Sequence, residues 1–126
     1  MYHHHIYGDR LFHTRSNGYG TSVELFGSTE NGEIPMSLMN IALASCVTMC
    51  VQSFWKHTFG DNQARIETSI DYEEGGFYLN VTLPALLTQH LENALRDFVA
   101  QKCRVKQLLA KDVTVVIDFH YHSKGA

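Results

Sequence analysis

Apolar and polar positions alternate with a short period in the first part of the chain. Aromatic, β-branched and histidine residues alternate loosely over 2–7 and 10–15, and the tripeptide Ser-Asn-Gly at 16–18 supplies a hairpin-type turn before a further run at 21–26. Alternation of this kind is typical of half-buried strands. We therefore expect a small antiparallel sheet of two or three strands within residues 1–33.

Residues 35–59 carry the strongest helical pattern. Proline at position 35 suits the first position of a helix, and apolar residues then recur at i, i+3 and i+4 while others cover much of the opposite side. A helix that is apolar nearly all round is expected to be buried nearly all round. A membrane span is the alternative, but polar residues interrupt the run, and no uninterrupted stretch approaches the ~20 residues that a span needs.

Residues 64–122 return to short elements. They predict two strands joined by a hairpin turn at 73–76, then an amphipathic helix, a short helical piece at 105–110 and a last strand. The three strands are expected at 64–72, 77–83 and 113–121. This order predicts an α+β fold with an antiparallel sheet in one domain, 1–126. Because these elements hardly cover so apolar a central helix, we expect a homodimer.

Composition narrows the classes of partner. With 44% apolar and 18% charged residues, the chain of 126 residues is expected to fold around a real core. A formal net charge of −3 argues against a general affinity for phosphate backbones, so we expect no nucleic-acid partner. The first ten residues are polar and rich in histidine, without the apolar core of a signal peptide. We therefore expect a cytoplasmic protein that does not bind a membrane.

Three cysteines are too few, and odd in number, for a secreted disulfide framework. Cys46 and Cys50 are four residues apart and so lie on one face of the predicted helix. A disulfide across one helical turn is strained, so either one of these two thiols reacts or both are core residues. Cys103 lies near a helix end with three cations within 102–106, where the pKa of a thiol is expected to fall.

Histidines offer a competing chemistry. His3, His4 and His5 form a cluster, and His120 and His122 share one face of the predicted last strand, with spacings compatible with metal ligation. Adjacent residues on a strand point to opposite faces, however, and exposed histidine pairs are usually solvated. We therefore expect no metal and no other cofactor.

The run from Pro35 to Cys46, PMSLMNIALASC, resembles the signature P-M-E-L-L-L-A-A-L-G-S-C that opens the central helix of the OsmC/Ohr family of thiol peroxidases. In this family a second cysteine follows at the end of the second long helix in a Cys-Pro-Val context. Cys103 stands at the matching place here, followed by Arg104 and Val105. The resemblance spans roughly residues 35–118. It implies an OsmC-like fold, with an antiparallel sheet around a long buried central helix in an intertwined homodimer.

The resemblance also implies an activity. A thiolate attacks the O–O bond of a hydroperoxide and becomes a sulfenic acid, which a second thiol converts to a disulfide. By this resemblance Cys46 is the peroxidatic residue, Cys103 is the resolving residue, organic hydroperoxides are the substrates and a thiol reductant regenerates the enzyme. Cys46 lies about eleven residues inside its helix, beyond the reach of the helix dipole, so a cation is expected to activate it. Family members use an N-terminal arginine held by a glutamate, and Arg15 is the first candidate here, with Arg10 the second.

The surroundings of Cys46 leave alternatives to the peroxidase function open. An apolar wall around the thiol is expected from Met36, Met39, Cys50 and Phe54. At 36 and 37, however, where relatives carry the glutamate, this chain has methionine and serine. The alternative function is therefore a catalytically weakened OsmC-fold dimer that binds a small apolar or electrophilic ligand. A third possibility is that Cys46 and Cys50 cooperate as a sensor of oxidants.

Overall fold

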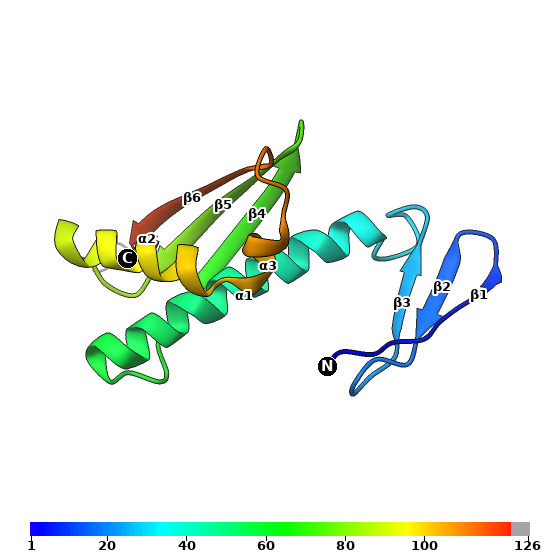
Figure 1. Cartoon of the computed structure of the whole chain (residues 1–126), viewed down its shortest axis with the longest axis horizontal. Helices are drawn as coiled ribbons and strands as arrows, with labels where there is room; N and C mark the ends of the chain where they lie inside the picture. Colours follow the sequence, from blue (N-terminus) through cyan, green and yellow to red (C-terminus); the bar gives the residue numbers. More distant parts are fainter. Residues whose placement is uncertain (122–126) are drawn as a thin grey trace. The chain divides into compact units, whose positions relative to one another are not determined.

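The structure, a computed structural model, describes residues 1–121. The chain divides into two compact units, residues 1–39 and residues 40–126, called here the N-terminal unit and the C-terminal unit. The prediction of a single domain over 1–126 stays a prediction. The elements, coloured in chain order in Figure 1, are β1 (Ile6–Arg10), β2 (His13–Ser16), β3 (Val23–Phe26), α1 (Pro35–Phe59), β4 (Glu67–Glu73), β5 (Gly76–Leu83), α2 (Gln89–Lys102), α3 (Arg104–Leu108) and β6 (Thr114–Tyr121).

The N-terminal unit contains the expected small sheet. Its strands lie in the order β1-β2-β3, and both neighbouring pairs are antiparallel. The chain turns between β2 and β3 at Gly18, whose φ is +64°, and a Cβ there would collide with the carbonyl oxygen of Thr21. Only glycine suits that position without strain. The turn foreseen around Ser-Asn-Gly therefore has a physical basis in one residue.

Helix α1 has the expected bounds, Pro35–Phe59, and both ends are capped. At its start the Ser37 hydroxyl accepts a hydrogen bond from the Ile34 N–H at 2.8 Å and donates one to the Ile34 carbonyl at 2.9 Å. This satisfies a backbone donor that the helix itself leaves unpaired. At its end Gly60, with φ +72°, donates to the Lys56 carbonyl at 2.8 Å, which is a left-handed helix cap.

The sheet of the C-terminal unit, β4-β5-β6, corrects part of the expected topology. Strands β4 and β5 form the predicted antiparallel hairpin, and its two-residue turn has positive φ at Glu74 and Gly75, as a type I′ turn requires. The pair β5–β6 is parallel, with Phe77 opposite Val115. The prediction of an all-antiparallel sheet is therefore wrong for β6. Parallel neighbours need a long crossover, and α2 and α3 supply it.

The core of the C-terminal unit lies between one face of this sheet and the helices (Figure 1). Along β5, inward residues are buried and outward residues are exposed, as strand geometry dictates. The buried core residues come mainly from α1, β5 and α2, and those with 2% exposure or less are Leu43, Val47, Val51, Leu79, Val81, Leu83, Leu95, Val99 and Cys103. Cys103 thus belongs to the best-packed part of the molecule.

Helix α1 is buried on one side only in the single chain, so the expected burial nearly all round is not shown. On the opposite side Ile41 is 46% exposed, Met49 65% and Phe59 48%. By length and a mean hydropathy of 1.4, α1 also passes the test for a membrane span. Core helices of water-soluble proteins pass the same test, so this finding is weak support for a span.

Candidate active site

The three cysteines meet at one place in the C-terminal unit. Cys46 and Cys50 come from adjacent turns of α1, and Cys103 lies between α2 and α3. Their three sulfur atoms all lie within 4.8 Å of one another. Cys46 is half-buried, Cys50 is 8% exposed and Cys103 is fully buried. The prediction that the sulfurs of Cys46 and Cys103, remote in sequence, come together on folding is confirmed.

Local structure explains why Cys103 faces α1. Helix α2 ends there, because the Cys103 N–H donates to the Val99 carbonyl at 2.9 Å while the residue itself adopts an extended conformation. The chain then turns at once into α3, for which Cys103 is the N-cap. Packing of Phe98 against Phe54, with ring centroids 5.8 Å apart, holds this end of α2 on α1.

Hydrogen bonds make Cys46 the most acidic of the three thiols. Burial by itself raises the pKa of Cys46, but hydrogen bonds from the Val105 N–H, the Cys103 thiol, the Arg104 N–H and the Cys50 thiol outweigh burial and lower it. The two backbone donors stand at the start of α3, where a helix leaves its first N–H groups unpaired. A sulfur anion on Cys46 is therefore stabilised by the protein backbone.

The other two thiols are held in the protonated form. Burial raises the pKa of Cys103 to about 12, and proximity to Cys46 adds to the effect. Burial also raises the pKa of Cys50, again with a contribution from the neighbouring Cys46 charge. The expectation that flanking cations lower the pKa of Cys103 is wrong, because the sulfur points into the core whereas Lys102 and Arg104 are exposed.

An open groove of about 600 Å³ leads to the cluster. Its lining mixes apolar side chains with polar and basic ones: Cys46, Met49, Cys50, Ser53, His57, Phe98, Lys102 and Arg104. Cys50 was expected to line such a pocket, and it does. Phe54 does not, because it is 6% exposed and packs into the core behind the groove. Sequence analysis missed Met49, Phe98 and the two cations as lining residues.

Comparison with known proteins places this arrangement in a fold family. No protein-family model matches the sequence, and no curated protein matches it significantly. An OsmC-like protein from Mycoplasma pneumoniae superposes with a TM-score of 0.69 at 11% identity, over 97% of this chain and 96% of that chain. An organic hydroperoxide resistance protein OsmC from Legionella pneumophila gives 0.67 at 16% identity, over 95% and 98%.

A third structure agrees with these two. An organic hydroperoxide resistance protein from Elizabethkingia anophelis, with thiocyanate bound, gives a TM-score of 0.64 at 14% identity, over 97% of this chain and 98% of that chain. This chain has the OsmC-like fold. The resemblance stated for residues 35–118 is thus confirmed at the level of the fold, and the likeness extends over nearly the whole chain.

For Arg15, the predicted activating arginine, the structure describes contacts within the N-terminal unit. In the N-terminal unit Arg15 lies 3.4 Å from the Asp9 carboxylate and 5.2 Å from the centre of the Tyr7 ring. Met36 and Met39 also belong to this unit, and both are more than a third exposed. The roles of Arg15, Arg10, Met36 and Met39 stay predictions. The cations that line the groove in the C-terminal unit are Lys102 and Arg104.

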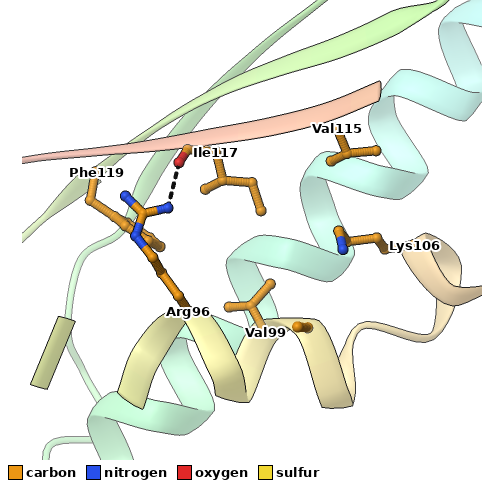
Figure 2. Close-up of a pocket in the computed structure, with 7 residues that line it drawn as sticks. Arg96, Val99, Lys106, Val115, Ile117 and Phe119 are labelled. Atoms are coloured by element: carbon orange, nitrogen blue, oxygen red, sulfur yellow. Dashed lines mark hydrogen bonds between the residues drawn. The ribbon is translucent and has the colours of Figure 1, made fainter. Parts of the chain in front are cut away.

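A second, smaller cavity of about 150 Å³ lies between α2, α3 and β6 (Figure 2). Of its two basic residues, Arg96 is already engaged, because its guanidinium donates to the Ile117 carbonyl (Figure 2). This hydrogen bond is 2.8 Å long, and the guanidinium also lies over the Phe119 ring, 4.7 Å from its centre. The Glu92 carboxylate lies 3.7 Å from the same group. These contacts tie α2 to β6, so we interpret this cavity as structural.

No histidine within residues 1–121 belongs to the cluster of potential ligands that the three cysteines form. Among residues 1–121 the three cysteines are the only group of potential metal ligands of this kind. The ring of His120 bonds the Asn80 side chain at 2.8 Å, and the rings of His4 and His5 contact Tyr19 and Tyr7. His122 lies outside the described residues.

Proposed function

We propose that this protein reduces organic hydroperoxides, with Cys46 as the peroxidatic residue and Cys103 as the resolving residue. One observation carries the proposal: the only thiol of the cluster with a lowered pKa stands within 4.8 Å of a second, buried thiol. A thiolate nucleophile beside a protonated partner is the arrangement that a two-cysteine peroxidase needs. The peroxide-resistance proteins that share the fold agree with it.

The chemistry balances with these residues. The Cys46 thiolate attacks the terminal peroxide oxygen, the O–O bond breaks, and Cys46 becomes a sulfenic acid. The alkoxide that leaves takes up one proton from solvent, equivalent to the proton that the Cys46 thiol lost on ionisation, and departs as an alcohol. The Cys103 thiol then attacks the Cys46 sulfur and releases water, which leaves a Cys46–Cys103 disulfide. An external dithiol donates two electrons and two protons, restores both thiols and becomes a disulfide itself. Burial of Cys103 keeps its proton in place until the sulfenic acid forms.

The groove supports an organic substrate. Met49 and Phe98 offer apolar surface beside Cys46, which favours a carbon chain over hydrogen peroxide. Lys102 and Arg104 add positive charge at the same groove, and positive charge favours an anionic sulfur and an anionic leaving oxygen. We further propose that Arg15 serves the same site.

We also propose a cytoplasmic homodimer. The support is the uncovered side of α1, where Ile41, Met49 and Phe59 leave apolar surface exposed in the single chain. Exposed apolar surface of this extent on one helix is typical of a protein–protein contact. Light scattering on the purified protein measures the mass directly. A mass of one chain, at concentrations where peroxide is consumed, would contradict the dimer.

The second candidate function is that of a catalytically weakened OsmC-fold dimer that binds a small apolar or electrophilic ligand. One contact favours it. Relatives carry glutamate at 36 or 37, whereas Ser37 here is engaged in capping α1 through both hydrogen bonds to Ile34. A protein that has lost the carboxylate is expected to regain turnover when it is restored. The variant Met36→Glu separates the candidates: a large gain in peroxide consumption indicates a weakened peroxidase.

The direct experiment follows the thiols. Reduced protein receives one equivalent of cumene hydroperoxide without reductant, and peptide mapping then locates disulfides. We expect loss of two thiols per chain and a Cys46–Cys103 disulfide, which still forms in Cys50→Ser. If Cys50→Ser abolishes oxidation, Cys46 and Cys50 act as a sensor pair instead. If all thiols stay reduced while peroxide persists, the peroxidase proposal fails.

A further inference from the structure

The third thiol, Cys50, has no part in the peroxide cycle, yet it completes a triangle of sulfur atoms. All three sulfur–sulfur separations are within 4.8 Å. A metal ion bonded to three sulfurs at about 2.3 Å, and lying at their centre, needs sulfur–sulfur separations of about 4.0 Å. The cluster is therefore within about 1 Å of the geometry of a three-thiolate site.

We propose that Cys46, Cys50 and Cys103 form a binding site for a soft, thiophilic metal ion, for which Cu(I) is the best match. This inference goes beyond the proposed peroxide chemistry. Thiolates are soft ligands and select Cu(I), Zn²⁺ and iron–sulfur clusters over hard cations such as Mg²⁺ or Ca²⁺. The donor set thus decides the class of metal.

The number of donors favours Cu(I) within that class. Among residues 1–121 the group of possible ligands consists of these three sulfurs, with no histidine or carboxylate in it. Structural Zn²⁺ almost always takes four protein ligands. Cu(I) accepts three sulfurs in a plane, so it needs no further protein ligand here.

Charge and access are consistent with such a site. Binding of Cu(I) displaces the protons of the Cys50 and Cys103 thiols to solvent. The resulting three thiolates and one Cu(I) carry a net charge of minus two, and burial of this charge needs nearby cations. Lys102 and Arg104 line the groove that leads to Cys46 and Cys50, so they lie where they offset it. The groove gives an ion a path to the cluster. A bound metal also occupies Cys46, so metal binding and attack on peroxide exclude each other.

The test is an anaerobic titration of the full-length reduced chain with Cu(I), in competition with a chromogenic Cu(I) chelator. The background variant His3→Ala/His4→Ala/His5→Ala removes the exposed histidine cluster as a rival site. We expect one tightly bound Cu(I) per chain and an X-ray absorption spectrum with three sulfur neighbours. Loss of second-shell partners alone weakens metal sites by about 10- to 100-fold. Loss of one of three ligands, in Cys50→Ser or Cys46→Ser, is therefore expected to weaken binding at least about 100-fold.

Controls separate this inference from the peroxidase proposal. Ser53→Ala alters the same groove without removing a sulfur, so its Cu(I) affinity is expected to match that of the parent. Circular dichroism checks that each variant is folded, and the half-buried Cys46→Ser keeps the test valid if Cys50→Ser unfolds. Unchanged affinity in a folded Cys46→Ser or Cys50→Ser variant, a two-sulfur spectrum, or tighter binding of Zn²⁺ than of Cu(I) would overturn it. Cys50 is required for the proposed metal site but not for the proposed peroxide cycle. Failure of the Cu(I) site therefore leaves the peroxidase proposal standing, and the reverse also holds.

Discussion

The acidity of Cys46 depends on backbone donors, and a proline can delete one of them. Arg104 is the first residue of α3, and its N–H donates to the Cys46 sulfur. Proline is favoured at a first helical position, where its missing N–H costs no helical hydrogen bond. The preceding residue, Cys103, is extended, which suits a residue before proline. Arg104→Pro should therefore keep α3 while removing one donor to the thiolate.

The size of the effect follows from the hydrogen bond. A hydrogen bond to a charged group contributes about 1.5–3 kcal/mol. One pKa unit corresponds to about 1.4 kcal/mol, so the lost donor is worth about one to two units. Cys46 is only half-buried, and water can replace part of the donor. We therefore expect the pKa of Cys46 to rise by about one unit, and the thiolate fraction below the pKa to fall about tenfold.

Alkylation rates measure this change directly. The rate at which iodoacetamide modifies Cys46, followed by mass spectrometry of its peptide, is recorded against pH for the parent, Arg104→Pro and Arg104→Ala. The alanine variant removes the same guanidinium but retains the N–H, so the difference between the two variants isolates the backbone donor. Identical pH profiles for Arg104→Pro and Arg104→Ala would refute a role for this N–H.

Three further predictions test the core, the buried thiol and the N-terminal arginine. Leu43→Ala, at a fully buried position, is expected to lower the free energy of unfolding by about 2–5 kcal/mol in denaturant titrations. Because the pKa of Cys103 is raised from 9.0 to about 12, the folded state holds this proton more tightly, so stability is full below pH 9.0 and declines towards about pH 12. This decline in the free energy of unfolding is up to about 1.4 kcal/mol per pH unit. In Cys103→Ala the contribution of this thiol is absent, so unfolding curves at alkaline pH should show a smaller decline than in the parent. Arg15→Ala is expected to lower cumene hydroperoxide turnover, whereas an unchanged turnover would remove Arg15 from the site.

The helices and strands could be predicted from the sequence because local signals accompany the apolar pattern. Pro35 and Gly60 bound α1, and the Glu-Glu-Gly-Gly turn fixes the register of the β4–β5 hairpin. The direction of β6 has no such local signal. It depends on how the crossover through α2 and α3 returns to the sheet, which is a property of the whole C-terminal unit.

The sequence predicted which sulfur atoms meet at the site, but it did not predict how the pKa values of the thiols are shifted. Spacing and resemblance together indicated that Cys46 and Cys103 meet, and they do. The pKa of Cys103 was expected to fall because cations flank it in sequence. That inference treated charge as following sequence proximity, whereas burial and the direction of N–H groups decide the pKa of each thiol. The helix start at Arg104 was the signal that could have revealed the backbone donors.

Arg104, the residue after Cys103, bears on the ionisation of Cys46. In the motif that this chain resembles, proline follows the second cysteine and cannot donate a backbone hydrogen bond. Here Arg104 supplies an N–H to Cys46 and also lines the groove. The described donors that lower the pKa of Cys46 all belong to the C-terminal unit, so none of them comes from residue 36 or 37. We therefore expect Met36→Glu to change peroxide turnover, through the positioning of the proposed arginine, more than the pKa of Cys46.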